Sequence, residues 1–272
     1  MLNDTRRNAA IEGSIASLDL DGKIVLEIGT GAGLIALLFA RYGAKHVYTC
    51  EMNANMARIA HDIVAASGFG DRITVIHAAS RHVIETGMLP TAPDIIFTET
   101  VDCGVIGEGF YDIREDIRNI AGPETVILPS RIEQSGVLIE SEAIRGLNEV
   151  RDVCGFDLSA INRFSTRHYF PVRAPLHEFT LMTEATVIRN YDYRSHVDNL
   201  CRTMTAVRSG TVHGLLSWFA LDFGGHVVSN SVHLDSHWHQ AFHPLKKPMQ
   251  VNEGNELRLM LDYEGVASIN KL

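Results

Sequence analysis

The sequence predicts a doubly wound α/β domain with a parallel sheet at residues 1–129, followed by a β-rich domain at residues 130–272. Strand-like and helix-like segments alternate through the first half, and a glycine-rich loop follows the first predicted strand. Strand-like runs dominate the second half. Regular alternation of strand and helix implies right-handed βαβ units around a parallel sheet, which gives the fold class of the first half.

The elements of the first half are predicted from apolar runs and helical periodicity. Short apolar runs such as Lys23-Ile24-Val25-Leu26-Glu27-Ile28-Gly29 are typical of buried parallel strands. The predicted strands are residues 23–29, 46–51, 72–77, 93–99 and 125–128. The predicted helices are residues 5–18, 34–42, 53–67 and 112–120.

The pattern changes after Leu128-Pro129-Ser130-Arg131. Further strands are predicted at residues 134–139, 178–188, 211–223, 226–232 and 256–263. Turn formers such as Ser209-Gly210 and Gly224-Gly225 separate them. Residues 142–175 interrupt this half with a helix and an irregular segment. We therefore expect a mostly antiparallel, β-barrel-like domain with an inserted arm.

Composition excludes several classes of function. Of the 272 residues 46% are hydrophobic, and the formal net charge of −9 argues against a nucleic-acid binder and suits a cationic partner better. The four cysteines lie far apart, as expected of reduced thiols rather than a zinc site: Cys50, Cys103, Cys154 and Cys201. The sequence shows neither a signal peptide nor a membrane span, so we expect a soluble, cytoplasmic protein without a membrane partner.

The glycine-rich loop reads Glu27-Ile28-Gly29-Thr30-Gly31-Ala32-Gly33. A dinucleotide fingerprint starting at Gly29 would need a glycine at Leu34. Glycine at every second position after an acidic residue is instead the methyltransferase form of this loop. Glu51 ends the next predicted strand, where a carboxylate can accept both ribose hydroxyls. The loop therefore predicts S-adenosylmethionine, with NAD, FAD or an unliganded turn as the alternatives.

Several segments resemble motifs of one enzyme family. They are Met1-Leu2-Asn3-Asp4-Thr5-Arg6-Arg7-Asn8, Glu99-Thr100-Val101-Asp102-Cys103-Gly104-Val105-Ile106-Gly107-Glu108, Gly210-Thr211-Val212-His213-Gly214, Trp218-Phe219 and Ser236-His237-Trp238. The first resembles the segment before the glycine loop of protein arginine methyltransferases, and the second resembles their double-glutamate loop. The third and fourth resemble the barrel strands before their histidine loop, and the last resembles that histidine loop. The stretch Thr100–Gly104 lacks bulky landmarks and so resembles the monomethylating branch.

The resemblance implies which residues bind the cofactor. Arg7 would contact the carboxylate of S-adenosylmethionine, with Arg6 as the neighbour in case the register is shifted by one. The other implied cofactor-binding residues are Glu27, Gly29, Thr30, Gly31, Glu51 and Ser80. Family members often carry a glutamate after the third strand; here Ala78-Ala79-Ser80-Arg81-His82 indicates backbone contacts to adenine near Ser80. The family's lid helix is expected to be missing, shortened or supplied by a partner, and the barrel is expected to be incomplete because it ends early, at Leu272.

Two glutamates carry the predicted chemistry. Two carboxylates can hold the planar fork of a guanidinium group and draw positive charge toward the nitrogens that they bind. Glu99 follows a buried strand, and Glu108 lies between Gly107 and Gly109. We therefore predict Glu99, Glu108 and His237 as catalytic, and Glu99, Glu108, Trp238 and Asp102 as substrate-binding. Taken alone, either glutamate is equally well explained as a solvated or helix-capping acid.

Four histidines near the end of the chain have a second interpretation. His233, His237, His239 and His243 contain a His-x-His pattern that could bind a metal ion, but no companion ligand set is evident and no metal is predicted. His237 fits the substrate loop, hydrogen-bonded to an acid or relaying a proton. His239 and His243 are expected to be surface imidazoles.

The sequence thus predicts an S-adenosylmethionine-dependent arginine guanidino N-methyltransferase that makes monomethylarginine. The compact chain favours free L-arginine or a small guanidino compound, with peptidyl arginine as the alternative. The rivals are another small-molecule N-methyltransferase and an inactive cofactor-binding partner subunit. The predicted arm resembles the family's dimerisation arm, and its apolar residues Val153, Phe156, Leu158 and Ile161 need burial, so a two-fold homodimer is expected.

Overall fold

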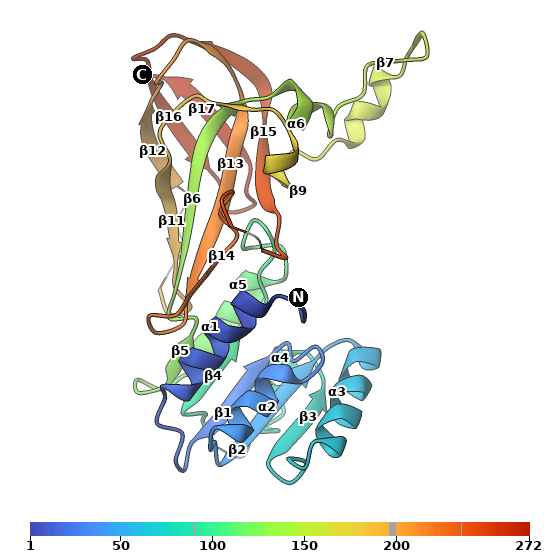
Figure 1. Ribbon diagram of the computed structural model, residues 1–272, viewed down its shortest axis with the longest axis vertical. Coiled ribbons are helices and arrows are strands. Elements are labelled where there is room, and N and C mark those ends of the chain that lie inside the picture. The colour runs from blue at the N-terminus through green and yellow to red at the C-terminus, as the bar shows by residue number, and fades with distance from the viewer. Residues whose placement is uncertain (90, 196–199, 235) are drawn as a thin grey trace.

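Figure 1 shows the computed structural model, which describes residues 1–89, 91–195, 200–234 and 236–272. An α/β half lies at one end of the long axis and a β-rich half at the other, with the arm projecting from the latter. The predicted fold class, a parallel-sheet domain followed by an antiparallel β-rich domain, is confirmed. None of the helices in the described part of the chain combines the length and apolar composition needed to cross a membrane.

The first half is built on a five-stranded parallel sheet with the order β3-β2-β1-β4-β5. The strands are β1 (Ile24–Ile28), β2 (His46–Glu51), β3 (Ile73–His77), β4 (Ile95–Thr98) and β5 (Val126–Leu128). In the central strand, Ile28 pairs with Cys50 of β2 and with Thr98 of β4. The residues that follow these three positions therefore lie at one edge of the sheet, where ligands bind in doubly wound folds.

Five helices belong to this half: α1 (Thr5–Ala16), α2 (Leu34–Arg41), α3 (Ala54–Ala66), α4 (Ser80–Glu85) and α5 (Phe110–Ile120). Asp4 caps α1 because its side chain accepts a hydrogen bond from the Arg7 amide at 2.9 Å. Helix α1 lies between the two halves and packs against β14 (Val227–Ser229) of the second half. The first turn of α1 is thereby held above the carboxyl edge of the parallel sheet.

Apart from a two-stranded hairpin in the arm, the described residues of the second half form two antiparallel sheets. The larger has the order β10-β6-β13-β15-β9, with β11 on β6 and β14 on β13, and the smaller has the order β12-β16-β17. The remaining strands are β6 (Arg131–Glu140), β9 (Phe170–Val172), β10 (Thr180–Leu181), β11 (Thr186–Tyr191), β12 (Leu200–Thr205), β13 (Gly210–Asp222), β15 (Gln240–Val251), β16 (Glu256–Leu261) and β17 (Ala267–Lys271). One apolar core joins the sheets, since Leu215 of β13 and Leu259 of β16 belong to the same buried cluster.

The arm extends away from both sheets (Figure 1). It comprises α6 (Glu142–Gly146), β7 (Asp152–Val153), β8 (Phe156–Asp157) and the 3-10 turns η1 (Ser159–Phe164) and η2 (Ala174–Leu176). The apolar side chains of β7, β8 and η1 are exposed, Phe156 by 70% and Phe164 by 82%. The large aromatic residues of the rest of the chain are mostly buried, so the arm leaves apolar surface without a partner in this chain.

The structure differs from the predicted elements mainly in the second half. Strands β9, β12, β15 and β17 were not predicted. Pro244 and Pro248 lie within β15 and hide its strand pattern, because proline lacks the amide that a sheet ladder uses. The predicted strand 178–188 is interrupted between β10 and β11, where the Leu138 amide donates to Thr183 Oγ1 at 3.2 Å rather than to a backbone carbonyl.

Candidate active site

The glycine-rich loop turns sharply after β1. Gly29, Gly31 and Gly33 have φ values of 84°, 54° and 85°, a left-handed conformation that favours glycine. The Gly29 and Thr30 amides donate to the Cys50 carbonyl oxygen at 2.9 and 3.1 Å, which fixes the loop against β2. A Cβ atom at Gly29 would lie 2.7 Å from the Thr100 methyl group, whereas one at Gly31 would meet nothing within 4 Å. The loop is therefore open at Gly31.

Two acids lie beside this loop in different environments. Glu27 is buried, and its Oε2 accepts from the Thr30 hydroxyl at 2.7 Å and from the Thr49 hydroxyl at 2.6 Å. Burial raises the pKa of Glu27. Glu51 is half-buried, and its Oε2 accepts from the Gly31 amide at 3.1 Å. Glu27 thus fixes the loop from inside, while Glu51 lies at its rim.

Ser80 begins α4 at the same side of the sheet. Its hydroxyl donates to Asp116 Oδ2 of α5 at 2.6 Å, and Asp116 also pairs with Arg81 at 3.0 Å. The Ser80 side chain is therefore engaged between two helices. The Ser80 backbone, rather than its side chain, is therefore the part that could contact the cofactor.

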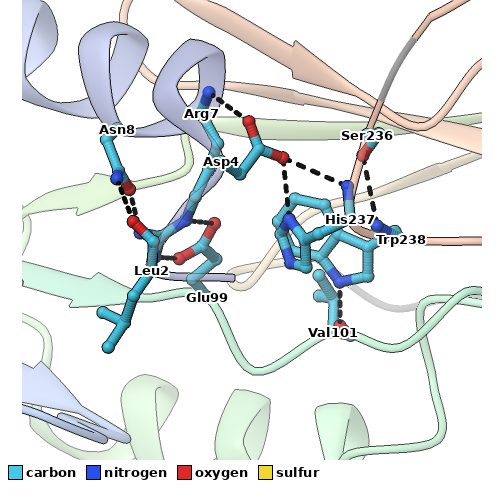
Figure 2. A network of polar contacts seen from close by, with 9 residues as sticks. All are labelled: Leu2, Asp4, Arg7, Asn8, Glu99, Val101, Ser236, His237 and Trp238. Carbon is cyan, nitrogen blue, oxygen red and sulfur yellow. Dashed lines mark hydrogen bonds and ion pairs between the residues drawn. The ribbon is translucent and has the colours of Figure 1, made fainter.

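Arg7 reaches from the first turn of α1 to Glu99 at the end of β4 (Figure 2). Arg7 Nε donates to Glu99 Oε1 at 2.8 Å, and Arg7 Nη2 pairs with Glu99 Oε2. Both side chains are buried, with exposures of 4% and 6%. Burial lowers the pKa of Arg7 to about 10, which leaves the guanidinium charged at neutral pH. Glu99 thus holds a planar guanidinium through both of its oxygens, the bidentate geometry that a carboxylate offers such a group.

Asp4 and His237 form a second polar contact next to this pair (Figure 2). His237 Nδ1 lies 2.8 Å from Asp4 Oδ2, and the His237 amide donates to the same oxygen at 3.2 Å. A carboxylate only accepts, so Nδ1 carries a proton, and in the neutral imidazole Nε2 keeps a lone pair. Among the residues that the structure describes, nothing hydrogen-bonds Nε2, which is buried. Burial lowers the pKa of His237, against the opposing hydrogen bond with Asp4.

Trp238 connects the histidine loop to the double-glutamate loop. Its Nε1 donates to the Val101 carbonyl at 3.1 Å, and its indole packs edge-on against Phe219, with ring centroids 5.3 Å apart. Only 8% of Trp238 is exposed. These contacts position the two loops relative to each other.

The double-glutamate loop ends at Glu108, whose side chain is exposed. Packing around its carboxyl group, and then the charge of Asp102, raises the pKa of Glu108. No hydrogen bond of Glu108 to another described residue is formed. Asp102 Oδ1 accepts from the Gly104 and Gly107 amides at 3.1 and 3.0 Å. Asp102 therefore shapes the loop from within.

The C-terminal histidines do not act together. His237 contacts Asp4, whereas His239 Nε2 accepts from Arg173 Nε at 2.9 Å. The expectation that His243 is a surface imidazole is wrong: His243 is fully buried, with Nδ1 2.7 Å from the Gly265 carbonyl and Nε2 2.8 Å from the Ser217 hydroxyl. Burial lowers the pKa of His243 to about 4. In the described ranges no group of three or more metal-ligating side chains comes together.

The structure brings some predicted site residues together and adds others. Arg7, Glu99, His237 and Trp238 belong to one neighbourhood, whereas the Ser80 side chain is turned toward α5. The sequence did not single out Asp4 as the acidic partner of His237. A signal for it was present, since Asp4 ends the Met-Leu-x-Asp segment at a helix-capping position.

Comparisons with known proteins agree on one family. Residues 137–270 match the family model described as "Arginine methyltransferase oligomerization subdomain". An "Arginine N(omega)-methyltransferase" from Streptomyces achromogenes subsp. streptozoticus is 38% identical over 269 residues, covering 97% of this chain and 74% of that protein. The mouse "Protein arginine N-methyltransferase 9" is 26% identical over 90% of this chain. The chain spans only 34% of that mouse relative's length.

Solved structures share the fold. The "Trypanosoma brucei PRMT1 enzyme-prozyme heterotetrameric complex with AdoHcy" matches with a TM-score of 0.82 at 20% identity, covering all of this chain and 91% of that one. The Arabidopsis thaliana "Protein Arginine Methyltransferase 10" structure matches with a TM-score of 0.75 at 20% identity, covering 96% of this chain and 86% of that one. At this level of identity the likeness concerns the fold alone.

Proposed function

Because the chain belongs to the protein arginine methyltransferase family, we propose that it transfers a methyl group from S-adenosylmethionine to a guanidino nitrogen of arginine. The observation that carries this proposal is the bidentate hold of Glu99 on a guanidinium group at the carboxyl edge of the sheet. That group is the chain's own Arg7, but the geometry is what an arginine substrate requires. The glycine-rich loop lies at the same edge, after the neighbouring strand.

The residues around the glycine-rich loop fit S-adenosylmethionine. The open space at Gly31, where even a Cβ atom would meet nothing, allows a ligand to approach the backbone. The Glu51 carboxylate at the rim suits a ribose diol, and the Arg7 guanidinium suits the methionine carboxylate. When bound, the cofactor supplies a methyl group on a positively charged sulfur.

The chain's own residues bind and orient the arginine side chain. Glu99 and Glu108 hold two sides of the guanidinium, which draws positive charge toward those nitrogens and leaves the remaining nitrogen more nucleophilic. His237 then accepts the departing proton at Nε2, while Asp4 keeps Nδ1 protonated and stabilises the imidazolium. The lowered pKa of His237 keeps Nε2 unprotonated at neutral pH, ready to accept.

The product and the substrate are finer parts of the same proposal. Monomethylarginine is supported by the stretch Thr100–Gly104, which lacks bulky residues, and by Asp102 within the loop. Free L-arginine or a small guanidino compound is supported by the name of the Streptomyces relative, "Arginine N(omega)-methyltransferase", which mentions no protein substrate. Peptidyl arginine remains the second candidate, because the mouse relative is named as a protein arginine methyltransferase.

A competition assay tests both parts. Free L-arginine, an arginine-rich peptide and histones are incubated together with labelled S-adenosylmethionine, and the products are separated by mass spectrometry. We expect label mainly in free monomethylarginine. Much faster methylation of the peptide would refute the small-molecule preference. Early accumulation of dimethylarginine would refute monomethylation.

We also propose a two-fold homodimer. The exposed apolar residues of the arm need a partner surface, and Phe156 and Phe164 are large members of this group with exposures of 70% and 82%. Light scattering at micromolar concentration should give twice the mass of the chain. Phe156→Asp combined with Phe164→Asp should give a folded monomer, whereas Leu272→Asp, a control at an exposed apolar residue outside the arm, should leave the dimer intact. A monomeric wild type would refute this proposal.

A further inference from the structure

We propose that Tyr169 is a positioning residue for the double-glutamate loop, and that it places Glu108 by holding Asp102. This inference rests on the proposed function, in which Glu108 binds the guanidinium. Tyr169 belongs neither to the α/β half nor to that loop. It lies where the chain returns from the arm, immediately before β9.

The side chain of Tyr169 fits against two glycines of the loop. A Cβ atom at Gly104 would lie 2.4 Å from the Tyr169 ring, and one at Gly107 would lie 2.9 Å from its hydroxyl oxygen. Neither distance is tolerable for a real side chain, so the loop approaches Tyr169 more closely than any residue but glycine allows. Tyr169 thus faces the segment that leads directly into Glu108.

Asp102 connects Tyr169 to the backbone of the loop. Its Oδ1 accepts from the Gly104 and Gly107 amides at 3.1 and 3.0 Å. The Tyr169 hydroxyl oxygen and Asp102 Oδ2 lie beside the same glycine, because a Cβ atom at Gly107 would lie 2.9 Å from the former and 2.2 Å from the latter. Burial, followed by the charge of Asp102, raises the pKa of Tyr169. A neutral phenol beside a carboxylate is the donor of the pair, so we infer that Tyr169 donates to Asp102. One carboxylate joins the tyrosine to two amides on either side of the turn.

The other side of Tyr169 is held by the second half of the molecule. A Cβ atom at Gly265, in the turn between β16 and β17, would lie 2.7 Å from the Tyr169 ring. The His243 ring centroid is 5.3 Å away, and His243 fixes that turn through its 2.7 Å contact with the Gly265 carbonyl. The next residue, Phe170, pairs with Phe242 of β15. Tyr169 therefore has little freedom to move away from the loop.

The base of the arm fixes the backbone just before Tyr169. The Asn148 side chain donates to the Thr166 carbonyl at 2.7 Å and accepts from the Thr166 amide at 2.9 Å, so the outgoing and returning segments are joined there. The double-glutamate loop is thus held by Tyr169, whose own position depends on the base of the arm. Glu108 follows Gly107 directly, so displacement of the Asp102–Gly107 turn would displace Glu108.

The test compares Tyr169→Phe, which keeps the ring and loses the hydroxyl, with Tyr263→Phe. Tyr169 and Tyr263 line one pocket together with Asp102 and Gly107, and the Tyr263 side chain is exposed. We expect Tyr169→Phe to lower kcat/KM for the guanidino substrate at least about tenfold, the range for a lost hydrogen bond to a charged group. The affinity for S-adenosylmethionine should change by less than about twofold, and Tyr263→Phe should behave as wild type.

Two further measurements separate positioning from a general loss of structure. Asp102→Asn alone should reproduce the Tyr169→Phe defect, and the double variant should be no worse, because both act on one contact. Hydrogen–deuterium exchange of a peptide covering residues 100–109 should increase in Tyr169→Phe. That readout needs no activity, so it tests the inference even if wild type fails to methylate arginine, a result that would refute the proposed function instead. The inference would be overturned if Tyr169→Phe left both kcat/KM and hydrogen–deuterium exchange unchanged. It would also be overturned if the defects of Tyr169→Phe and Asp102→Asn added up in the double variant, or if Tyr169→Phe lost cofactor affinity to the same extent as kcat/KM.

Discussion

Glu108→Gln and Glu99→Gln should each lower turnover of the guanidino substrate by about a hundredfold or more. Glutamine keeps the shape of the side chain but loses the charge that binds the guanidinium. Two charge-assisted hydrogen bonds are worth about 1.5–3 kcal/mol each, so weakening both accounts for a loss of this size. The measurement is single-turnover methyl transfer at saturating cofactor.

The two variants should differ in stability. Glu108 is exposed and has no partner among the described residues, so Glu108→Gln should unfold at the wild-type temperature. Glu99 is paired with buried Arg7, so Glu99→Gln leaves that cation without its counter-charge and should lower the Tm as well. Both variants should still bind S-adenosylmethionine. Glu124→Gln, a change at an exposed glutamate outside the site, is the control. Near-normal turnover in either active-site variant would count decisively against a mechanism with two carboxylates.

The placement of several candidate site residues could be predicted because strand ends are readable from sequence. Gly29, Glu51 and Glu99 each follow a short apolar run, and parallel strands bring such positions to one edge of a sheet. The parallel sheet was predicted strand by strand for the same reason. Short α4 escaped detection, since six residues provide too few turns for a periodic pattern.

Contacts between distant segments could not be predicted. Arg7 and Glu99 are 92 positions apart, and nothing in either local pattern indicates that one guanidinium meets both oxygens of that carboxylate. The burial of His243 is of the same kind: its partners, Ser217 and Gly265, come from a neighbouring strand and from the C-terminal turn. His243 stands between Phe242 and Pro244 in the sequence, and neither neighbour indicates that the fold supplies hydrogen-bond partners for a buried imidazole.

The loop around Asp102 shows why residue type alone is a weak guide to role. Asp102 was predicted to contact the substrate because it lies between the two glutamates. In the structure its Oδ1 accepts hydrogen bonds from two loop amides, and its charge adds to the effect of burial in raising the pKa of Glu108. These contacts fit an effect on the substrate exerted through Glu108, whereas a direct contact of Asp102 with the substrate stays a prediction.

Arg7→Ala should also have a large effect, on stability, cofactor binding and turnover together, because it removes a group with two roles. The structure pairs Arg7 with buried Glu99, and breaking a buried ion pair on one side costs about 3–5 kcal/mol. The proposed function also assigns Arg7 to the cofactor carboxylate. We therefore expect Arg7→Ala to lower the Tm, weaken S-adenosylmethionine binding at least about tenfold, and abolish turnover, as measured by thermal unfolding, calorimetry and methyl transfer.

Arg7→Lys distinguishes charge from geometry. Lysine keeps the positive charge but lacks the planar fork, so it cannot engage both oxygens of Glu99 as a guanidinium does. We expect Arg7→Lys to recover part of the lost stability while turnover stays low, because Glu99 is no longer held in the bidentate orientation. Arg6→Ala is the matched control, since Arg6 is the adjacent but exposed arginine of the same helix. If Arg6→Ala impaired cofactor binding and Arg7→Ala did not, the cofactor role would belong to Arg6, and Arg7 would serve only to pair with Glu99.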